Sequence, residues 1–233
     1  MNTACIYHGP SLLDGQPIVA FVTFGSRNEK TGDTAQLWIM PANEAPHLAV
    51  KSGNDASVCG DCIHRPLLAK ANKVKPCYVK VWQAPLAIFG AWMRGNISLV
   101  ALDAVTPTLR GYKLRLGAYG DPAALPRHII EALCADTLGI LGYTHQWKLP
   151  QFAWLSQYCM ASVDHAADLL LARSLGFRSF YVRDKSELDL VPDNAVKQCP
   201  AAKEAGAKVT CSQCMACGGL SSLAKNDRAI NQH

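Results

Sequence analysis

The sequence lacks a long apolar run. No stretch approaches the roughly 20 consecutive apolar residues that a membrane-spanning helix needs. Residues 1–10 also lack the basic start and apolar run of a secretory signal peptide. We therefore expect no membrane partner and a cytoplasmic location. Thiols stay reduced in that compartment, so the ten cysteines are expected to be metal ligands or buried side chains rather than disulfides.

An excess of charge of one sign is also missing. The chain has 23 Lys and Arg against 18 Asp and Glu, for a net charge of +5. A nucleic-acid-binding domain usually gathers more basic charge on one face, so ordinary surface charge is the simpler interpretation, and a nucleic acid stays open as a partner. Hydrophobic residues make up 49% of the 233-residue chain, which excludes global disorder and allows a sizeable core.

Strand-like and helix-like segments alternate along the chain. Residues 18–24 and 36–40 are β-rich and flank a polar turn, which predicts an N-terminal hairpin. Further strands are predicted at 113–116, 140–144, 158–163 and 177–182, and helices at 85–95, 125–138 and 165–175. This alternation predicts an α/β fold with parallel βαβ units, either a partial (β/α) barrel or a parallel sheet. Residues 221–233 are expected to be a frayed tail.

Three parts are expected along the chain. Residues 1–55 form the hairpin and a loop, residues 56–184 form the α/β core, and residues 185–233 form a cysteine-rich C-terminal segment with its tail. The core also carries the first of two groups of cysteines.

Seven cysteines fall into two compact groups. The first consists of Cys59, Cys62 and Cys77, and the second of Cys199, Cys211, Cys214 and Cys217. A CxxC spacing lets both sulfurs face one metal from a tight turn. A CxxCxxC run with a distant fourth thiol is typical of a [4Fe–4S] cluster, which we expect on the second group. Zinc on four of the seven thiols, or no metal, are the alternatives.

The first group is one ligand short. A fourth ligand from His64, Cys5, Cys134 or the second group would give a closed structural site. Without one, the metal would keep an open corner, as a catalytic metal needs. Cys134 and Cys159 lie in apolar contexts and are expected to be buried side chains rather than ligands.

Polar residues follow four predicted strands, at 119–122, 144–146, 162–164 and 183–184. The carboxyl ends of parallel strands share one edge of the sheet, where active sites collect. Asp121, His145 and Asp164 are therefore candidate catalytic residues. Each also has a plain structural interpretation, because Asp121 and Asp164 would suit helix N-caps or turns and His145 would suit a loop.

These motifs together resemble the radical S-adenosylmethionine enzymes. In that family a cysteine trio after the first barrel strand holds a [4Fe–4S] cluster, and a glycine-rich segment after the second strand meets the cofactor. The resemblance implies that Cys59, Cys62 and Cys77 hold such a cluster. It also implies that Gly117, Gly120 and Asp121 bind S-adenosylmethionine. The family spaces its trio as CxxxCxxC, whereas here Cys77 lies further along the chain.

A closer likeness is to an uncharacterised group of phage and prophage proteins. It rests on Cys-Gly-Asp-Cys, Leu-Gly-Ala-Tyr-Gly-Asp-Pro, Gly-Tyr-Thr-His-Gln-Trp and the terminal Cys-x-x-Cys-x-x-Cys-Gly-Gly, and covers residues 18–219. It implies a protein of a phage-infected or prophage-carrying bacterium.

The favoured hypothesis is an iron–sulfur enzyme acting on a small molecule, a nucleotide or a nucleic-acid-related substrate. The alternative is a non-catalytic zinc module that binds nucleic acid or a host protein, with Trp82 stacking on a base. A core position for Trp82 is the favoured interpretation of its apolar neighbours. A dithiol redox enzyme using Cys59 and Cys62 is a third possibility, and the additional cysteines nearby favour metal binding over it.

Overall fold

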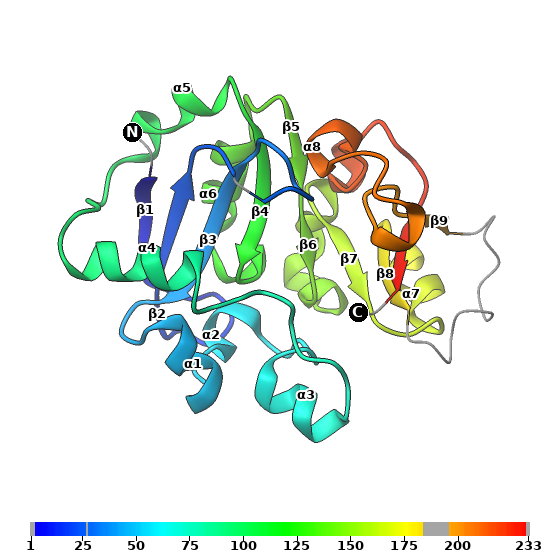
Figure 1. The fold of residues 1–233 in the computed structure, drawn as a ribbon, viewed down its shortest axis with the longest axis horizontal. Helices are drawn as coiled ribbons and strands as arrows, with labels where there is room; N and C mark the ends of the chain where they lie inside the picture. The colour runs from blue at the N-terminus through cyan, green and yellow to red at the C-terminus, as the bar shows by residue number, and fades with distance from the viewer. Residues whose placement is uncertain (1–2, 27, 184–195, 232–233) are drawn as a thin grey trace.

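The computed structural model describes residues 3–26, 28–183 and 196–231. It confirms the α/β class, with two five-stranded sheets ordered β1-β2-β3-β4-β5 and β6-β7-β8-β10-β9. Figure 1 shows the N-terminal sheet and the C-terminal sheet side by side, with α1 and α3 at one end of the strands. No helix in the described part of the chain is long and apolar enough to cross a membrane.

The first sheet is antiparallel at its N-terminal side and parallel beyond it. Its strands are β1 (Thr3–Pro10), β2 (Pro17–Thr23), β3 (Ala35–Pro41), β4 (Lys113–Tyr119) and β5 (Gly139–Leu141). β1, β2 and β3 pair antiparallel in sequence order, and β3-β4 and β4-β5 pair parallel. Five consecutive residues of β2 are buried, which fits a strand covered on both faces.

The crossover from β3 to β4 holds most of the helices. These are α1 (Pro46–Ser52), α2 (Ala56–Cys59), α3 (Pro66–Asn72), α4 (Ala84–Met93) and α5 (Thr106–Leu109). Proline in the first turn suits α1, α3, α4 and α5, since that position needs no backbone N–H. α6 (Arg127–Cys134) follows β4 and buries Ile129, Ile130 and Leu133 in the main core. The predicted helix 125–138 is therefore shorter at both ends.

The second sheet is parallel throughout. Its strands are β6 (Tyr143–Thr144), β7 (Met160–Val163), β8 (Ser179–Arg183), β9 (Lys197–Gln198) and β10 (Arg228–Asn231). α7 (Asp168–Ser174) connects β7 to β8, and α8 (Cys211–Cys214) lies in the segment between β9 and β10. The predicted strands at 158–163 and 177–182 correspond to β7 and β8.

Gly142 joins the two sheets. The single strand predicted at 140–144 is divided at this residue into β5 and β6, which belong to different sheets. Gly142 donates its N–H to the Cys217 carbonyl at 3.0 Å and accepts from the Met160 N–H at 2.9 Å. A Cβ here would lie 2.7 Å from the Cys159 sulfur, so only glycine allows this approach. The junction also anchors the C-terminal cysteine run.

The expectation of a frayed tail over 221–233 is wrong for its described part. β10 lies between β8 and β9, and both Ala229 and Ile230 are buried. Asp227 fastens the start of β10, because its carboxylate accepts from the Ser179 N–H at 2.8 Å and pairs with Arg173 at 2.7 Å. A strand with two buried apolar residues is too short to stand out in the sequence; its partners across the sheet make it a strand.

Candidate metal centre at the carboxyl edge of the strands

Asp121 ties together the ends of two strands from different sheets. It follows β4, is 6% exposed, and accepts from the Ala123 N–H at 2.9 Å. Its second oxygen accepts from the Thr144 hydroxyl at 3.1 Å and the His145 N–H at 2.8 Å, at the end of β6. Burial raises the pKa of this carboxyl, and the hydrogen bonds oppose that rise. Asp121 therefore caps the following turn and also positions His145.

Gly117 and Gly120 pack against the protein's own backbone. Gly120 has a φ of +83°, and a Cβ on it would lie 2.7 Å from the Ile39 carbonyl oxygen. A Cβ on Gly117, whose φ is +68°, would lie 2.5 Å from the Gly120 carbonyl oxygen. The turn that places Asp121 thus requires both glycines. Backbone packing therefore accounts for glycine at both positions, in addition to the cofactor role that the resemblance implies.

Asp164 faces two imidazoles at the end of β7. Its Oδ1 lies 2.9 Å from His64 Nε2, and its Oδ2 lies 3.6 Å from His145 Nε2. The N-cap interpretation of Asp164 is wrong, because α7 begins at Asp168, and its N-cap position, Ala167, makes no side-chain cap. His64 is one of the residues considered as a fourth ligand for the first cysteine group. The fold brings it to this edge, beside Asp164.

The charges of this group support one another. Burial by itself would lower the pKa of His145, but its hydrogen bonds to Asp164 and Cys62 outweigh burial and raise it well above the ordinary value. The pKa of His64 is raised in the same way, against its burial, by Asp164 and the Lys75 carbonyl. Burial alone would raise the pKa of Asp164, yet the two imidazoles lower it. The carboxylate is thus strongly held in its charged form.

The first cysteine group lies against this edge. Cys59 ends α2, and Cys62 Sγ lies 3.6 Å from His145 Nε2. Cys77 returns to the same loop because its N–H donates to the His64 carbonyl at 2.7 Å, which closes the segment that contains α3. Burial raises the pKa of the Cys59 thiol well above its usual value, and the Cys62 and Cys77 thiols add to the rise. The three thiols are therefore close enough to act on each other.

Arg65 braces the loop that carries the first cysteine group. Its guanidinium donates to the Gly60 carbonyl at 2.8 Å and the Gly53 carbonyl at 2.7 Å, and it pairs with buried Asp55 at 2.8 Å. Arg65 thus fixes the loop around Cys59 and Cys62 through bonds to residues that are near it in the sequence.

The second cysteine group gathers around α8. Thr210 begins this helix with a capping box that uses Gln213. Burial raises the pKa of Cys217 to about 12; a hydrogen bond from Tyr143 opposes the rise, and the neighbouring thiols, Cys199, Cys211 and Cys214, add to it. Cys199 reaches the group because its N–H donates to the Ala229 carbonyl of β10 at 2.8 Å. The fourth thiol therefore depends on the strand that the sequence did not reveal.

Arg115 acts on a thiol of each cysteine group. This side chain on β4 donates to the Tyr78 hydroxyl at 2.9 Å, and its positive charge acts on both the Cys77 and the Cys211 thiols. Burial would lower its pKa, but the surrounding tyrosines and Cys211 raise it. The charge of one arginine therefore favours the thiolate form of a cysteine in each group.

Other sequence expectations are also resolved. Cys5, Cys134 and Cys159 are buried, the last two as predicted. Trp82 is 64% exposed, so its expected core position is wrong, and Tyr78 is 76% exposed. Both lie on the irregular chain between Cys77 and α4, from which Val81 is buried in the main core instead. The strand end at Arg183 belongs to β8, and Asp184 is outside the described residues.

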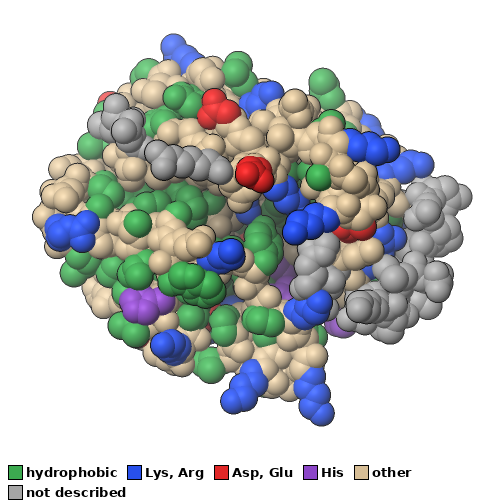
Figure 2. All heavy atoms as spheres, viewed as in Figure 1, with side chains coloured by type: hydrophobic (Ala, Val, Ile, Leu, Met, Phe, Trp, Pro, Cys, Tyr) green, Lys and Arg blue, Asp and Glu red, His purple; other side chains and the backbone are tan. Residues whose placement is uncertain are grey.

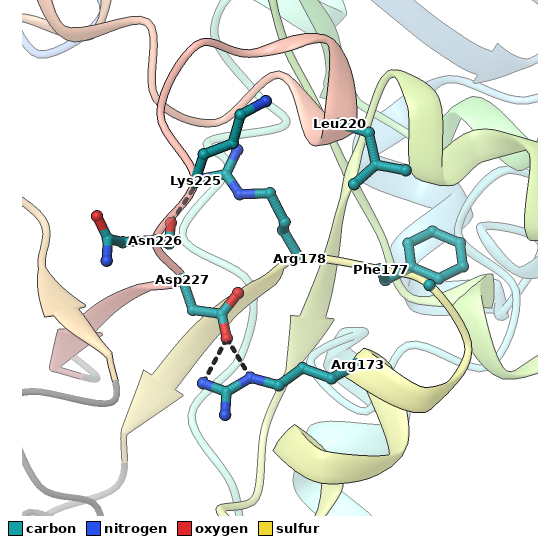
Figure 3. A pocket seen from close by; sticks show the side chains of 8 residues that line it. Arg173, Phe177, Arg178, Leu220, Lys225, Asn226 and Asp227 are labelled. Carbon is teal, nitrogen blue, oxygen red and sulfur yellow. Dashed lines mark hydrogen bonds and ion pairs between the residues drawn. The ribbon is translucent and has the colours of Figure 1, made fainter.

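A cavity of about 400 Å³ lies elsewhere, between α7, β8 and the segment before β10 (Figure 3). Its basic side chains have partners within the chain. Arg173 pairs with Asp227, and Arg178 donates to the Gly219 and Asn226 carbonyls. None of the predicted site residues lines it. Its polar groups fasten the C-terminal segment to the second sheet.

No protein-family model, curated protein or solved structure matches this chain.

Proposed function

We propose that this protein is an iron–sulfur enzyme whose active site lies at the carboxyl edge of its strands. Cys59, Cys62 and Cys77 hold a [4Fe–4S] cluster with one open corner. The second group, Cys199, Cys211, Cys214 and Cys217, holds a closed cluster. The observation that carries the proposal is the convergence of the open trio with His145 and Asp164, since Cys62 Sγ lies 3.6 Å from His145 Nε2.

The spacing of the thiols favours a cluster over zinc. Zn–S bonds of about 2.3 Å place tetrahedral thiolates about 3.8 Å apart. Among the described residues, His64, His145 and Asp164 are the only three potential ligands whose ligand atoms all lie within 4.8 Å of one another. No three thiols of either cysteine group meet that criterion among the described residues, although the thiols of each group are near enough to affect each other's pKa. A four-iron cube holds its thiolates further apart than one zinc ion does, and we therefore favour a cluster.

The order of features along the chain supports the resemblance to radical S-adenosylmethionine enzymes. The cysteine trio follows β3, the glycine-rich turn follows β4, and both sheets are parallel from β3 onward. We infer that the two sheets together correspond to a partial barrel. S-adenosylmethionine is the cofactor implied for the open corner, and a cluster bound there would supply the electron for its cleavage. His145, which lies beside Cys62 and Asp164, would then be near the bound cofactor.

Exposed aromatic side chains beside Cys77 support a nucleotide or nucleic-acid-related substrate. Tyr78 and Trp82 offer rings on which a base can stack, and Arg115 places a cation next to Tyr78. Figure 2 shows lysine and arginine side chains distributed over the visible face rather than in one stripe. This distribution fits a local contact with a nucleotide better than a long electrostatic track.

Anaerobic purification with metal analysis tests the proposal. We expect brown protein with about eight iron atoms per chain, or four per cluster. Either Cys62→Ser or Cys211→Ser should remove about half of the iron. Cys134→Ala is the matched control, because Cys134 is buried away from both groups on α6, and it should keep all the iron. Colourless protein that contains only zinc would sink the proposal.

The exposure of Trp82 favours one second candidate, a non-catalytic zinc module that binds single-stranded nucleic acid. It predicts zinc in place of iron, and a gel shift that weakens steeply with salt and with Trp82→Ala. Iron in the purified protein, or nucleic-acid binding that is unchanged by Trp82→Ala, would contradict this candidate.

A further inference from the structure

Two imidazoles and one carboxylate meet beside the first cysteine group. The ligand atoms of His64, His145 and Asp164 all lie within 4.8 Å of one another. The His64 and Asp164 side chains are each 14% exposed, and that of His145 is 22% exposed. These residues come from the loop after α2 and from the ends of β6 and β7, so the fold assembles the group from distant parts of the chain.

The hydrogen bonds of His64 leave its Nε2 facing a negative charge. His64 Nδ1 lies 2.8 Å from the Lys75 carbonyl oxygen, which can only accept, so Nδ1 must carry a proton. In the neutral imidazole, Nε2 then bears a lone pair, 2.9 Å from the Asp164 Oδ1 lone pairs. Two acceptors at that distance need a cation between them, either a proton or a metal ion. Orientation of a histidine by a backbone carbonyl is typical of metal ligands.

His145 is oriented independently toward the same point. Its backbone N–H donates to buried Asp121 at 2.8 Å, while its Nε2 faces Asp164 Oδ2 and the Cys62 thiol, each at 3.6 Å. The carboxylate of Asp164 thus presents one oxygen to each imidazole. Two histidines and one carboxylate on one side of a metal form a ligand set known for zinc and for non-haem iron.

We propose that His64 Nε2, His145 Nε2 and the Asp164 carboxylate bind a single divalent cation, Zn²⁺ or Fe²⁺, separate from the cysteine-bound clusters. Cys62 lies beside this site, with its Sγ 3.6 Å from His145 Nε2. A substrate bound there would contact both centres. The site uses nitrogen and oxygen donors, so it stands whether or not the cysteines carry iron–sulfur clusters.

Zn²⁺ is the probe for this site. Anaerobically purified protein of measured iron content is dialysed against a weak chelator and titrated with Zn²⁺ by competition with a chromophoric chelator. Wild-type protein should bind one Zn²⁺ ion more than His64→Ala or Asp164→Asn, with unchanged iron content and cluster absorbance. Loss of a direct ligand should weaken binding by more than the roughly 10–100-fold cost of losing an outer partner.

His128→Ala is the matched control, because His128 is exposed on α6, and it should titrate like the wild type. Folding of each variant is checked by circular dichroism. If folded His64→Ala and Asp164→Asn bind as much Zn²⁺ as the wild type, His64 and Asp164 form only an ion pair and the site is refuted. Loss of iron in a preparation that keeps the Zn²⁺ difference would count against the proposed clusters, not against this site.

A second measurement uses the wild-type protein, so it tests the site even if the variants do not fold. Diethylpyrocarbonate modifies accessible imidazoles, and peptide mapping locates the product. Zn²⁺ should protect His64 and His145 while His128 is modified as before. Equal modification of His64 and His145 with and without Zn²⁺ would overturn the proposal.

Discussion

At the scale of single residues, Asp121 shows how a buried carboxylate positions its neighbours in a site. Its two oxygens accept from three donors, the Ala123 N–H, the Thr144 hydroxyl and the His145 N–H, which fill most of its lone pairs. Its own N–H donates to the Val58 carbonyl at 2.6 Å, next to Cys59. One residue therefore connects β4, β6 and the first cysteine loop, and we describe it as a positioning residue.

Asp121→Asn should destabilise the fold. The amide that replaces one carboxylate oxygen brings a donor toward backbone or hydroxyl donors and leaves a buried group unpaired, at a cost of about 1–3 kcal/mol. Denaturant unfolding measures the change in the free energy of unfolding. Asp136→Asn is the control, since its ion pair with Arg110 is exposed, and it should cost less than about 1 kcal/mol. Equal effects of both substitutions would contradict the positioning role.

At the scale of elements, β10 links the sheet to the second cysteine group. It pairs with β8 and β9, and its Ala229 carbonyl holds the Cys199 N–H. A backbone hydrogen bond also positions Cys77. Its N–H donates to the His64 carbonyl, which brings the chain back beside Cys62 after α3. In both cases a backbone hydrogen bond outside a helix places a thiol.

Ala229→Pro should disrupt both β10 and the second metal site. Proline removes a ladder N–H from a strand that has neighbours on both sides, which costs about 3 kcal/mol or more. Thermal unfolding should show the loss of stability, and metal analysis should show a loss confined to the second group. Leu223→Ala, at a side chain that is 97% exposed, should change stability by less than about 0.5 kcal/mol. A proline variant with full metal content would show that β10 does not support Cys199.

At the scale of the whole molecule, Arg115 acts on thiols of both cysteine groups. Tyr143 also reaches the second group, since it hydrogen-bonds Cys217 and its pKa is raised well above the ordinary value by burial and by the nearby thiols. β4 and β6, from different sheets, supply these two side chains. The junction of the sheets therefore sets the electrostatic environment of both groups.

Arg115→Met should lower the reduction potential of the clusters. Loss of a nearby positive charge destabilises the more negative reduced state, and about 1.4 kcal/mol corresponds to about 60 mV for one electron. Anaerobic redox titration measures the midpoint potentials. Arg115→Lys should retain most of the wild-type potential, and Arg110→Met, at an exposed ion pair, should leave it unchanged. An unaltered potential in Arg115→Met would show that this charge is screened from both clusters.

The sequence by itself determined the α/β class, because strand and helix patterns are local and repeat along the chain. It also indicated β4, whose apolar and polar residues alternate, and β7, β8 and α4, which contain short apolar runs. The candidate residues at the strand ends could be proposed because parallel strands place their carboxyl ends at one edge. Asp121, His145 and Asp164 do lie near this edge. Asp121 accepts a hydrogen bond from the His145 N–H, and Asp164 faces the His145 imidazole.

Only the tertiary structure decided which distant residues meet. His64 is 100 residues from Asp164 in sequence, and nothing local distinguishes it from the other possible fourth ligands. β10 became a strand because β8 and β9 pair with it, and Trp82 stayed exposed although its neighbour Val81 is buried in the main core. Local patterns report the conformation of a segment, whereas the contacts between segments depend on which surfaces pack and which backbone groups find partners.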